Sequence, residues 1–477
     1  MTAKKITMTA AQIAVDLGDG SERGEYVNQD YILHRLGRPH RAINLMYCYY
    51  PLDAGWPVRA SDLPRKDGTS PTGAWDYPYD DYFPYEGGLA GKTGDCQPFA
   101  SMKDVRRHGQ DIILTLTVDP AVSDAHLVRI AEELRPFGRL MLRINHEAMG
   151  SWFAYNKRFS YQAVADFFVR FHKIIKEHAP HIRTILCVGD GKVHETGKLK
   201  YEDEFAEAIS VADIWSADTY LSLHFGWPFD IAEPGGMTHK RVTNQDIFDG
   251  LKFENERFLA YGNARAFALN EFNADGDVNG PFEQASQVEE FYLDLPKEAS
   301  FVGAVTFYQF RDRGRLGLEI EDPSNADCGY EQPIFETYKK IIALPQHLPE
   351  MTQGEDVSFP AVLRWGGSED ADGISIPLSL ESAPVFCEAT FDGEGADLNL
   401  MLEINGRWFY KKPGAKTIDL MPAFFTATAG DVALNIFAPP PTGTNAPGPL
   451  QGDDWAINYR TQIKNPPKMR IRYRPTM

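Results

Sequence analysis

The stretch Leu140-Met-Leu-Arg-Ile-Asn-His-Glu-Ala-Met-Gly-Ser-Trp-Phe153 decides the fold. Its apolar run ends abruptly in Asn145, His146 and Glu147, and a turn of small residues with two aromatics follows. A buried strand that stops in a cluster of ionisable groups is typical of a parallel sheet whose carboxyl edge faces an active-site crevice. The stretch therefore predicts a strand over 140–145 with Glu147 beside such a crevice.

Segments of the same kind recur on both sides of this stretch, and each is followed by a helical pattern or a long excursion. Eight strand-then-helix units predict a (β/α)8 TIM barrel of the α/β class, because strands buried on both faces are apolar throughout. The strands are expected over 6–17, 41–50, 111–118, 140–145, 182–189, 213–220, 265–271 and 301–310. The helices are expected over 24–36, 98–108, 123–134, 161–178, 201–209, 244–261, 282–295 and 332–344.

The character of the sequence changes after residue 349. Short alternating segments over 373–380, 398–404 and 432–437 are separated by Gly, Pro, Asn and Asp, which is the pattern of an antiparallel β-sandwich. We expect a catalytic barrel over 1–349 and a C-terminal β-sandwich domain over 350–477. Whether the sandwich binds glycan stays open, because a tryptophan can stack on a sugar ring or fill a core. The candidates are Trp365, Trp408 and Trp455.

Composition excludes several classes of partner. A formal charge of −19 disfavours binding to nucleic acid or an anionic membrane surface. The 5 cysteines are scattered without a CxxC pair, so neither a disulfide framework nor a zinc module is indicated, and we expect no cofactor and no metal. No signal peptide or long apolar run is visible. We expect a cytoplasmic protein as written, or a secreted or periplasmic one if a leader was removed; the oligomeric state stays open.

Two carboxylates end the fourth and seventh predicted strands, Glu147 and Glu271. Such a pair can cleave a glycosidic bond, one protonating the leaving oxygen and the other attacking or activating water, and a separation of about 5–5.5 Å selects the retaining route. If Arg143 and Tyr220 donate to Glu271, that carboxylate stays ionised as the nucleophile and its charge raises the pKa of Glu147. Other strand-end candidates for substrate binding are Asn145, His146, Asp218, Asn270, Tyr308 and Gln309.

The segment Arg143-Ile-Asn-His-Glu-Ala-Met-Gly-Ser-Trp-Phe153 resembles the fourth-strand signature of glycoside hydrolase family 26. This is the β-mannanase family of the retaining clan of (β/α)8 glycosidases. The resemblance implies that Glu147 is the acid/base and that His146 and Trp152 line the subsites of the cleaved sugar. Asp218-Thr-Tyr220 is similar to the family's sixth-strand Asp-x-Tyr, whose tyrosine orients the nucleophile, and Ala268-Leu-Asn-Glu271-Phe is similar to the segment that carries the nucleophile.

Two departures from the family pattern point away from mannan. Ala154-Tyr155 stands where the family has a second aromatic pair, and Phe307-Tyr-Gln-Phe310 replaces a tryptophan at the end of the eighth strand. Aromatic faces hold a sugar through its C–H surface, so the loss of two platforms implies another substrate. Arg311, Arg313 and Arg315 either contact an acidic sugar or pair with Glu319 and Glu321 in a solvated loop.

The residues as a whole favour a retaining glycoside hydrolase that acts on a β-linked oligo- or polysaccharide. The long loop over 51–96 suits an extended cleft and hence endo action, although it would equally block one end. One alternative is a metal-dependent enzyme in which His146 and Glu147, with Asp218, His224 or His194, bind a divalent ion, but no HxH or HExxH spacing is present. A second alternative is a barrel that binds glycan without catalysis.

Overall fold

A computed structural model describes most of the first 348 residues and separate segments of the rest. The described ranges are 4–6, 8–9, 11–18, 26–64, 83–92, 94–189, 197–224, 239–312, 314–348, 350–351, 361–364, 374–380, 384–391, 397, 400–424, 430–437, 460–463 and 468–472. The chain divides into two compact units, one over 11–135 and 140–348, the other over 1–10, 136–139 and 349–476.

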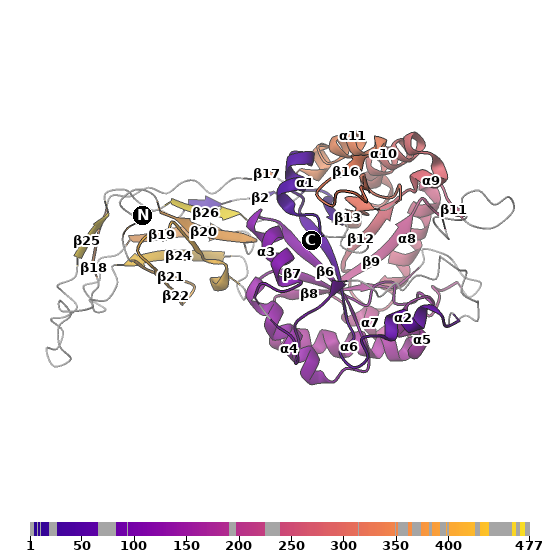
Figure 1. Cartoon of the computed structure of the whole chain (residues 1–477), viewed down its shortest axis with the longest axis horizontal. Coiled ribbons are helices and arrows are strands. Elements are labelled where there is room, and N and C mark those ends of the chain that lie inside the picture. The colour runs from indigo at the N-terminus through magenta and orange to yellow at the C-terminus, as the bar shows by residue number, and fades with distance from the viewer. Residues whose placement is uncertain are drawn as a thin grey trace. The chain divides into compact units, whose positions relative to one another are not determined.

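The first unit is a closed (β/α)8 barrel of eight parallel strands (Figure 1). Pairing of Leu17 with Ile43 closes the ring between the first and second strands. The barrel strands are β3 Ala14–Gly18, β4 Ala42–Tyr49, β6 Asp111–Val118, β7 Leu140–Ile144, β8 Ile182–Cys187, β9 Ile214–Tyr220, β12 Ala266–Asn273 and β13 Val302–Phe307.

A main helix follows each strand, and Figure 1 shows these helices around the outside of the barrel. The predicted helix over 161–178 is confirmed as α6, with the Ser160 side chain accepting a hydrogen bond from the Ala163 amide as its N-cap. The main helices of the other seven units are α1 Gln29–Leu36, α3 Phe99–Arg107, α4 Asp124–Leu134, α7 Ala206–Val211, α8 Asn244–Leu259, α10 Pro281–Glu298 and α11 Pro333–Ile341.

Shorter elements lie in the connections between these strands and helices. The short helices are α2 Trp56–Ser61, α5 Ala154–Arg158 and α9 Gly276–Asn279, with 3-10 turns at η2 Arg135–Phe137 and η3 Pro345–His347. The short strands are β5 Phe83–Pro84, β10 Ser222–His224, β11 His239–Arg241, β14 Arg311–Asp312, β15 Glu319–Glu321 and β16 Gly329–Glu331.

The barrel interior is apolar at one level and polar at the next. One buried side chain from every strand forms an apolar ring: Ala14, Ala42, Ile113, Met141, Ile185, Ile214, Ala268 and Ala304. Strand side chains alternate between faces, so the residues two positions further along should also face inward. Those residues are all buried and, apart from one cysteine, polar: Asp16, Asn44, Thr115, Arg143, Cys187, Ser216, Asn270 and Thr306. The interior thus becomes polar toward the carboxyl ends of the strands.

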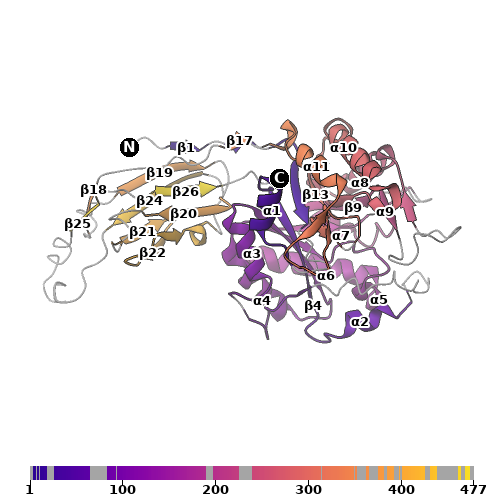
Figure 2. The same ribbon diagram turned by 45° about the horizontal axis from the view of Figure 1, so that its top comes forward.

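The second unit is an antiparallel β-sandwich, visible in Figure 2. Its larger sheet has the strand order β1-β19-β24-β21-β22, and a smaller one has the order β23-β20-β26. Its strands are β1 Lys4–Ile6, β2 Met8–Thr9, β17 Glu350–Met351, β18 Ala361–Arg364, β19 Ile374–Leu380, β20 Phe386–Thr390, β21 Leu400–Ile404, β22 Arg407–Lys411, β23 Thr417–Asp419, β24 Gly430–Phe437, β25 Arg460–Ile463 and β26 Lys468–Arg472, with a 3-10 turn η4 Met421–Ala423.

The N-terminal segment differs from the single strand expected over 6–17. Lys4–Ile6 pairs in parallel with β19, and Met8–Thr9 pairs with β17, so both belong to sheets of the second unit. The barrel strand begins only at Ala14.

The domain boundary at residue 349 stays a prediction. Within the described residues, no helix has the length and apolar character needed to cross a membrane.

Candidate active site

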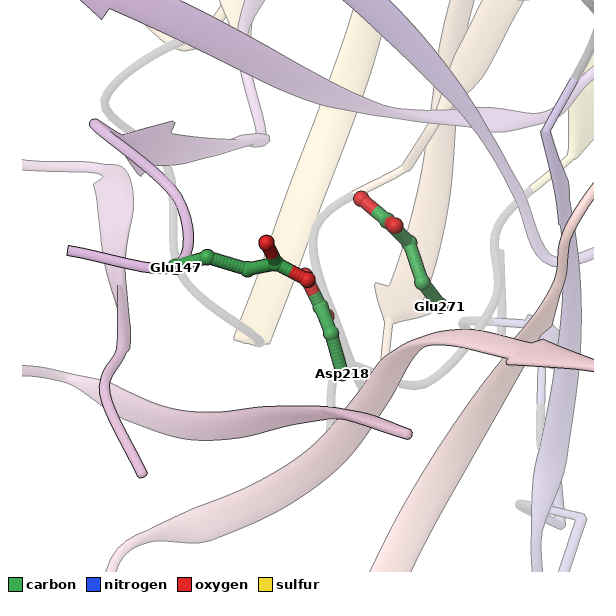
Figure 3. A group of neighbouring side chains, drawn as sticks. All are labelled: Glu147, Asp218 and Glu271. Carbon is green, nitrogen blue, oxygen red and sulfur yellow. The ribbon is translucent and has the colours of Figure 1, made fainter. Parts of the chain in front are cut away.

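Three carboxylates converge at the carboxyl ends of the barrel strands (Figure 3). Glu147 follows β7, Asp218 lies near the end of β9, and Glu271 lies near the end of β12. One carboxylate oxygen from each residue lies within 4.8 Å of the others. Glu147 and Glu271, far apart in the sequence, therefore meet at one place.

The turn that carries Glu147 is tied to the neighbouring strand. The Asn145 side chain accepts a hydrogen bond from the Val118 amide at 2.7 Å and donates one to the Val118 carbonyl at 3.1 Å. Asn145 and Glu147 have φ angles of 45° and 47°, in the left-handed region that non-glycine residues seldom occupy. Tyr155 Oη donates to the His146 carbonyl at 2.7 Å. These contacts hold a strained turn in one conformation, which is a common feature of functional sites.

The small-residue turn after Glu147 allows the aromatic pair to pack closely. A Cβ atom on Gly150 would lie 2.8 Å from the Trp152 indole and 2.9 Å from the Phe153 ring, so a larger residue would collide with both. Phe153 is buried and packs edge-on against His146 at 4.9 Å between ring centroids, whereas Trp152 is partly exposed. Trp152 therefore reaches solvent beside the catalytic candidates.

Helix α5 anchors this segment to the excursion after β4. Trp56 Nε1 donates to the Ala154 carbonyl at 3.0 Å, and the Arg158 guanidinium stacks over the Trp56 ring at 3.9 Å. Arg158 also pairs with Asp119 at 2.9 Å, so the aspartate that directly follows β6 forms an ion pair. Residues 65–82, the centre of the loop expected to form a cleft wall, lie outside the described residues.

Arg143 links two of the three carboxylates. Its fully buried guanidinium donates to Glu271 Oε1 at 2.8 Å through Nη1 and to the Asp218 carboxylate through Nη2. Nη2 also lies 3.6 Å from Cys187 Sγ. Tyr220 Oη donates to the second Glu271 oxygen at 2.7 Å. Arg143 and Tyr220 therefore both donate to Glu271, as predicted from the sequence.

A register shift in β12 places Glu271 at this level. Leu269 pairs with Ala217 on β9, but Glu271 pairs with Asp218, so Asn270 is an extra residue at a β-bulge. Bulges next to active sites commonly re-aim a side chain. Here the shift brings Glu271 level with Asp218 and within reach of Arg143.

Burial separates the pKa values of the groups around Arg143. Burial raises the pKa of Asp218 well above its usual value, with Arg143 opposing and the Glu271 charge adding to this effect. Burial also raises the pKa of the Cys187 thiol, and it lowers that of His146, assisted by the Arg143 charge. Burial disfavours the charged form of Arg143 and lowers its pKa. The acidic groups around the guanidinium have a larger combined effect and raise the pKa of Arg143. His146 is therefore neutral and Cys187 protonated at neutral pH.

Three further predicted residues lie near the carboxyl ends of neighbouring barrel strands, Asn270 in β12 and Tyr308 and Gln309 directly after β13. Asn270 is buried, and neither its side-chain nitrogen nor its oxygen has a hydrogen-bond partner among the described residues. Tyr308 packs edge-on against Tyr220 at 5.7 Å between ring centroids. The buried Gln309 donates to Asp312 at 3.3 Å, and the peptide bond between Tyr308 and Gln309 is cis.

The arginines after the eighth strand are engaged in ion pairs. Arg311 pairs with the buried Glu319 at 2.9 Å, and Arg315 pairs with Asp277 at 3.2 Å. The predicted pairing of Arg311 with Glu319 is present, but Glu319 is buried and not solvated, and Arg315 pairs with Asp277 instead of Glu319 or Glu321. Arg313 lies outside the described residues.

Sequence reasoning treated Cys187 only as one of several scattered thiols. The available signal was its position two residues after Ile185 in a barrel strand, which places both side chains on the inner face. Asp16 in β3 lies in the buried interior, where it accepts hydrogen bonds from Arg41 and from the Ala42 amide at the start of β4.

In the described part of the chain, the carboxylates Glu147, Asp218 and Glu271 are close enough together to share a metal ion. However, Arg143 donates to two of them and its charge opposes a second cation at the same place. His146, proposed as a ligand from the sequence, is not a member of this group. The His224 side chain and residue His194 lie outside the part of the chain that the structure describes.

Neither a family model nor a curated protein matches this sequence, so membership of family 26 is not confirmed. Solved structures with a similar fold include a family 39 glycoside hydrolase from Bacteroides cellulosilyticus WH2, with 12% identity and a TM-score of 0.42 over 90% of this chain and 82% of that one. A modular endo-β-1,4-mannanase of family 26 from Cellulomonas fimi has 11% identity and a TM-score of 0.40 over 90% and 89%. A family 51 α-L-arabinofuranosidase from Bifidobacterium longum has 10% identity and a TM-score of 0.43 over 92% and 98%.

Proposed function

We propose that the chain is a retaining glycoside hydrolase that cleaves a β-linked oligo- or polysaccharide. The observation that carries this proposal is the approach of Glu147 to Glu271, with one oxygen of each within 4.8 Å. Inverting enzymes need about 6.5–9.5 Å between their carboxyl groups to accommodate a water molecule, whereas retaining enzymes need about 5–5.5 Å. A closest oxygen approach of at most 4.8 Å is nearer to the retaining than to the inverting separation, which favours direct attack by one carboxylate.

Glu271 is the proposed nucleophile because two donors fix the position of its carboxylate. Arg143 and Tyr220 donate to its two oxygens, which orients the carboxylate for attack. Glu271 attacks the anomeric carbon while Glu147 gives its proton to the leaving glycosidic oxygen. Glu147 then takes a proton from the water that releases the sugar from Glu271, and both residues return to their starting state.

Neutral groups around this pair are proposed to bind the sugar. His146 carries no charge at neutral pH, so its ring can donate to or accept from a hydroxyl without pairing permanently with Glu271. Asn270 offers a buried amide with both polar atoms unpartnered among the described residues, and Trp152 offers an aromatic surface. Tyr308 and Gln309 are proposed to complete the subsite, while Asn145 acts by holding the turn.

The test measures hydrolysis of a polysaccharide panel, with proton NMR of the first product to read its anomeric configuration. The parent should release a product of retained configuration, and Glu147→Gln and Glu271→Gln should each lose several orders of magnitude in rate while still binding the sugar. Thr417→Ala, at an exposed position on strand β23 of the other unit, is the control and should keep full activity. An inverted product, or an unchanged rate in both glutamine variants, would contradict the proposal.

Two further expectations belong to the same proposal. Endo action is proposed from the long excursion after β4, and product lengths from a polymeric substrate would test it. A metal-dependent reaction at the same carboxylates predicts loss of activity after dialysis against EDTA, whereas the double displacement predicts full activity.

A further inference from the structure

The β-sandwich carries two large aromatic side chains on one exposed surface. Trp408 and Tyr410 lie on β22, and each is 50% exposed. They are two positions apart, so both project from the same face of the sheet, about 7 Å apart along the strand. We propose that this face is a second glycan-binding site, separate from the catalytic candidates, that takes a neutral polysaccharide chain. This second glycan-binding site goes beyond the proposed hydrolysis, and the proposal does not depend on that activity.

The opposite face of the same sheet supplies the core, which fixes the orientation of the aromatics. The residues alternating with them across β21 and β24 are fully buried, namely Leu402, Ile404, Leu434 and Ile436. Because strand side chains alternate between faces, Trp408 and Tyr410 lie on the side away from this core. Their exposure therefore follows from the strand register and not from a poorly packed core.

Polar groups form a row beside Trp408 on this surface. In the strand pairing, Trp408 lies opposite Glu403, Glu403 opposite Asn435, and Asn435 opposite Ser375. Directly paired residues share a face, so the row runs across four neighbouring strands, β22, β21, β24 and β19, which Figures 1 and 2 show in this order. None of these four side chains is fully buried.

The row is also rigid. Asn435 Nδ2 donates to Glu403 Oε2 at 2.6 Å, and the Gly406 amide donates to Glu403 Oε1 at 2.6 Å. Glu403 is thus held between a side chain and the tight turn that connects β21 to β22. Fixed acceptors and an amide beside aromatic rings suit the hydroxyls and the C–H face of a sugar, because one part stacks while the other forms hydrogen bonds.

The chemistry of the surface favours a glycan over a protein partner. The centre of a protein interface is depleted of charged residues, yet Glu403 lies directly opposite Trp408. A neutral chain fits better than a polyanion, because the protein carries a formal charge of −19 and the row itself contains the Glu403 carboxylate. Trp365 and Trp455, the other candidates from the sequence, lie outside the described residues.

The experiment uses the full chain carrying Glu147→Gln and Glu271→Gln, so that no polymer is cleaved. Affinity electrophoresis in gels containing β-mannan, xylan, mixed-linkage β-glucan or no polysaccharide measures the association constant. We expect retardation by at least one polymer, and Trp408→Ala or Tyr410→Ala should weaken the association about tenfold, because aromatic anchors dominate such contacts. Trp408→Phe should retain most of the affinity, and Thr417→Ala on another sheet should change nothing.

Thermal unfolding of every variant separates loss of the site from loss of the fold. The proposal is overturned if no polymer retards the chain that carries only Glu147→Gln and Glu271→Gln. It is also overturned if both alanine variants bind as tightly as that chain. It is also overturned if Trp408→Ala leaves glycan binding intact but changes the oligomeric state, since the surface would then contact protein. Hydrolysis by chains with intact glutamates is measured separately on short soluble oligosaccharides, where Trp408→Ala should leave the rate unchanged.

Discussion

The Arg143 guanidinium donates to the Glu271 carboxylate at 2.8 Å inside the barrel, where the arginine side chain has no exposed surface. The same guanidinium donates to Asp218. A charge taken out of water is stable only when it is paired, so the arginine and the two carboxylates depend on each other. The site is therefore part of the barrel's polar core as well as its candidate catalytic centre.

Replacing Arg143 by methionine should lower the free energy of unfolding by about 3–5 kcal/mol, because buried carboxylates are left without their partner. Arg143→Lys keeps the charge but cannot donate to both carboxylates from a planar fork, so its loss should be smaller. Urea denaturation measures the free energy of unfolding of both variants. Adding Asp218→Asn to Arg143→Met should restore part of the stability, and a double variant no more stable than Arg143→Met would contradict this account.

His146 should make stability depend on pH. Its pKa is well below the ordinary 6.5 in the folded protein, so below pH 6.5 the unfolded chain binds a proton that the folded chain does not. The contribution is fully present above pH 6.5 and is lost as the pH falls toward the folded pKa. His146→Gln should flatten the fall in unfolding free energy between pH 6.5 and 5 by at most about 1.4 kcal/mol per pH unit.

His181 provides the matched control for this measurement. Burial lowers its pKa to about 4, and its ring contacts the Arg135 carbonyl away from the three carboxylates. His181→Gln should therefore flatten the same pH profile but leave the rate of hydrolysis unchanged, whereas His146→Gln should change both. Equal rates for the two variants would remove His146 from the site.

The sequence predicted the barrel well because apolar strands and amphipathic helices alternate along the chain. Its prediction for α6 matches the observed Tyr161–His178, and Arg143, Tyr220 and Glu271 meet as expected. The sequence did not predict the pairing of Lys4–Ile6 with β19, because strand partners distant in sequence leave no local pattern. Nor did it predict the bulge at Asn270, which depends on register with the neighbouring strands.

Asn145 should matter for stability through the turn that carries Glu147. Asn145→Ala removes both hydrogen bonds to Val118 and leaves a buried amide and carbonyl unpaired, at a cost of about 1–3 kcal/mol. Alanine also tolerates a φ of 45° less well than asparagine does. Asn145→Gly loses the same hydrogen bonds but accepts this φ, so it should be less destabilised than Asn145→Ala. The free energy of unfolding, measured by urea denaturation, and the rate of hydrolysis should fall together. An unchanged free energy of unfolding for Asn145→Ala would contradict the proposed role of Asn145 in holding the turn.

The five cysteines should react with iodoacetamide in two classes. Cys187 and Cys387 are buried, and burial raises the pKa of both thiols, so neither should form the reactive thiolate in the folded protein. Cys48, Cys96 and Cys328 are partly exposed and should be alkylated first. Mass spectrometry after labelling with and without urea measures each site. Alkylation of Cys187 in the folded protein as fast as that of Cys96 would mean that the thiol beside Arg143 is open to solvent, which would contradict its burial inside the barrel.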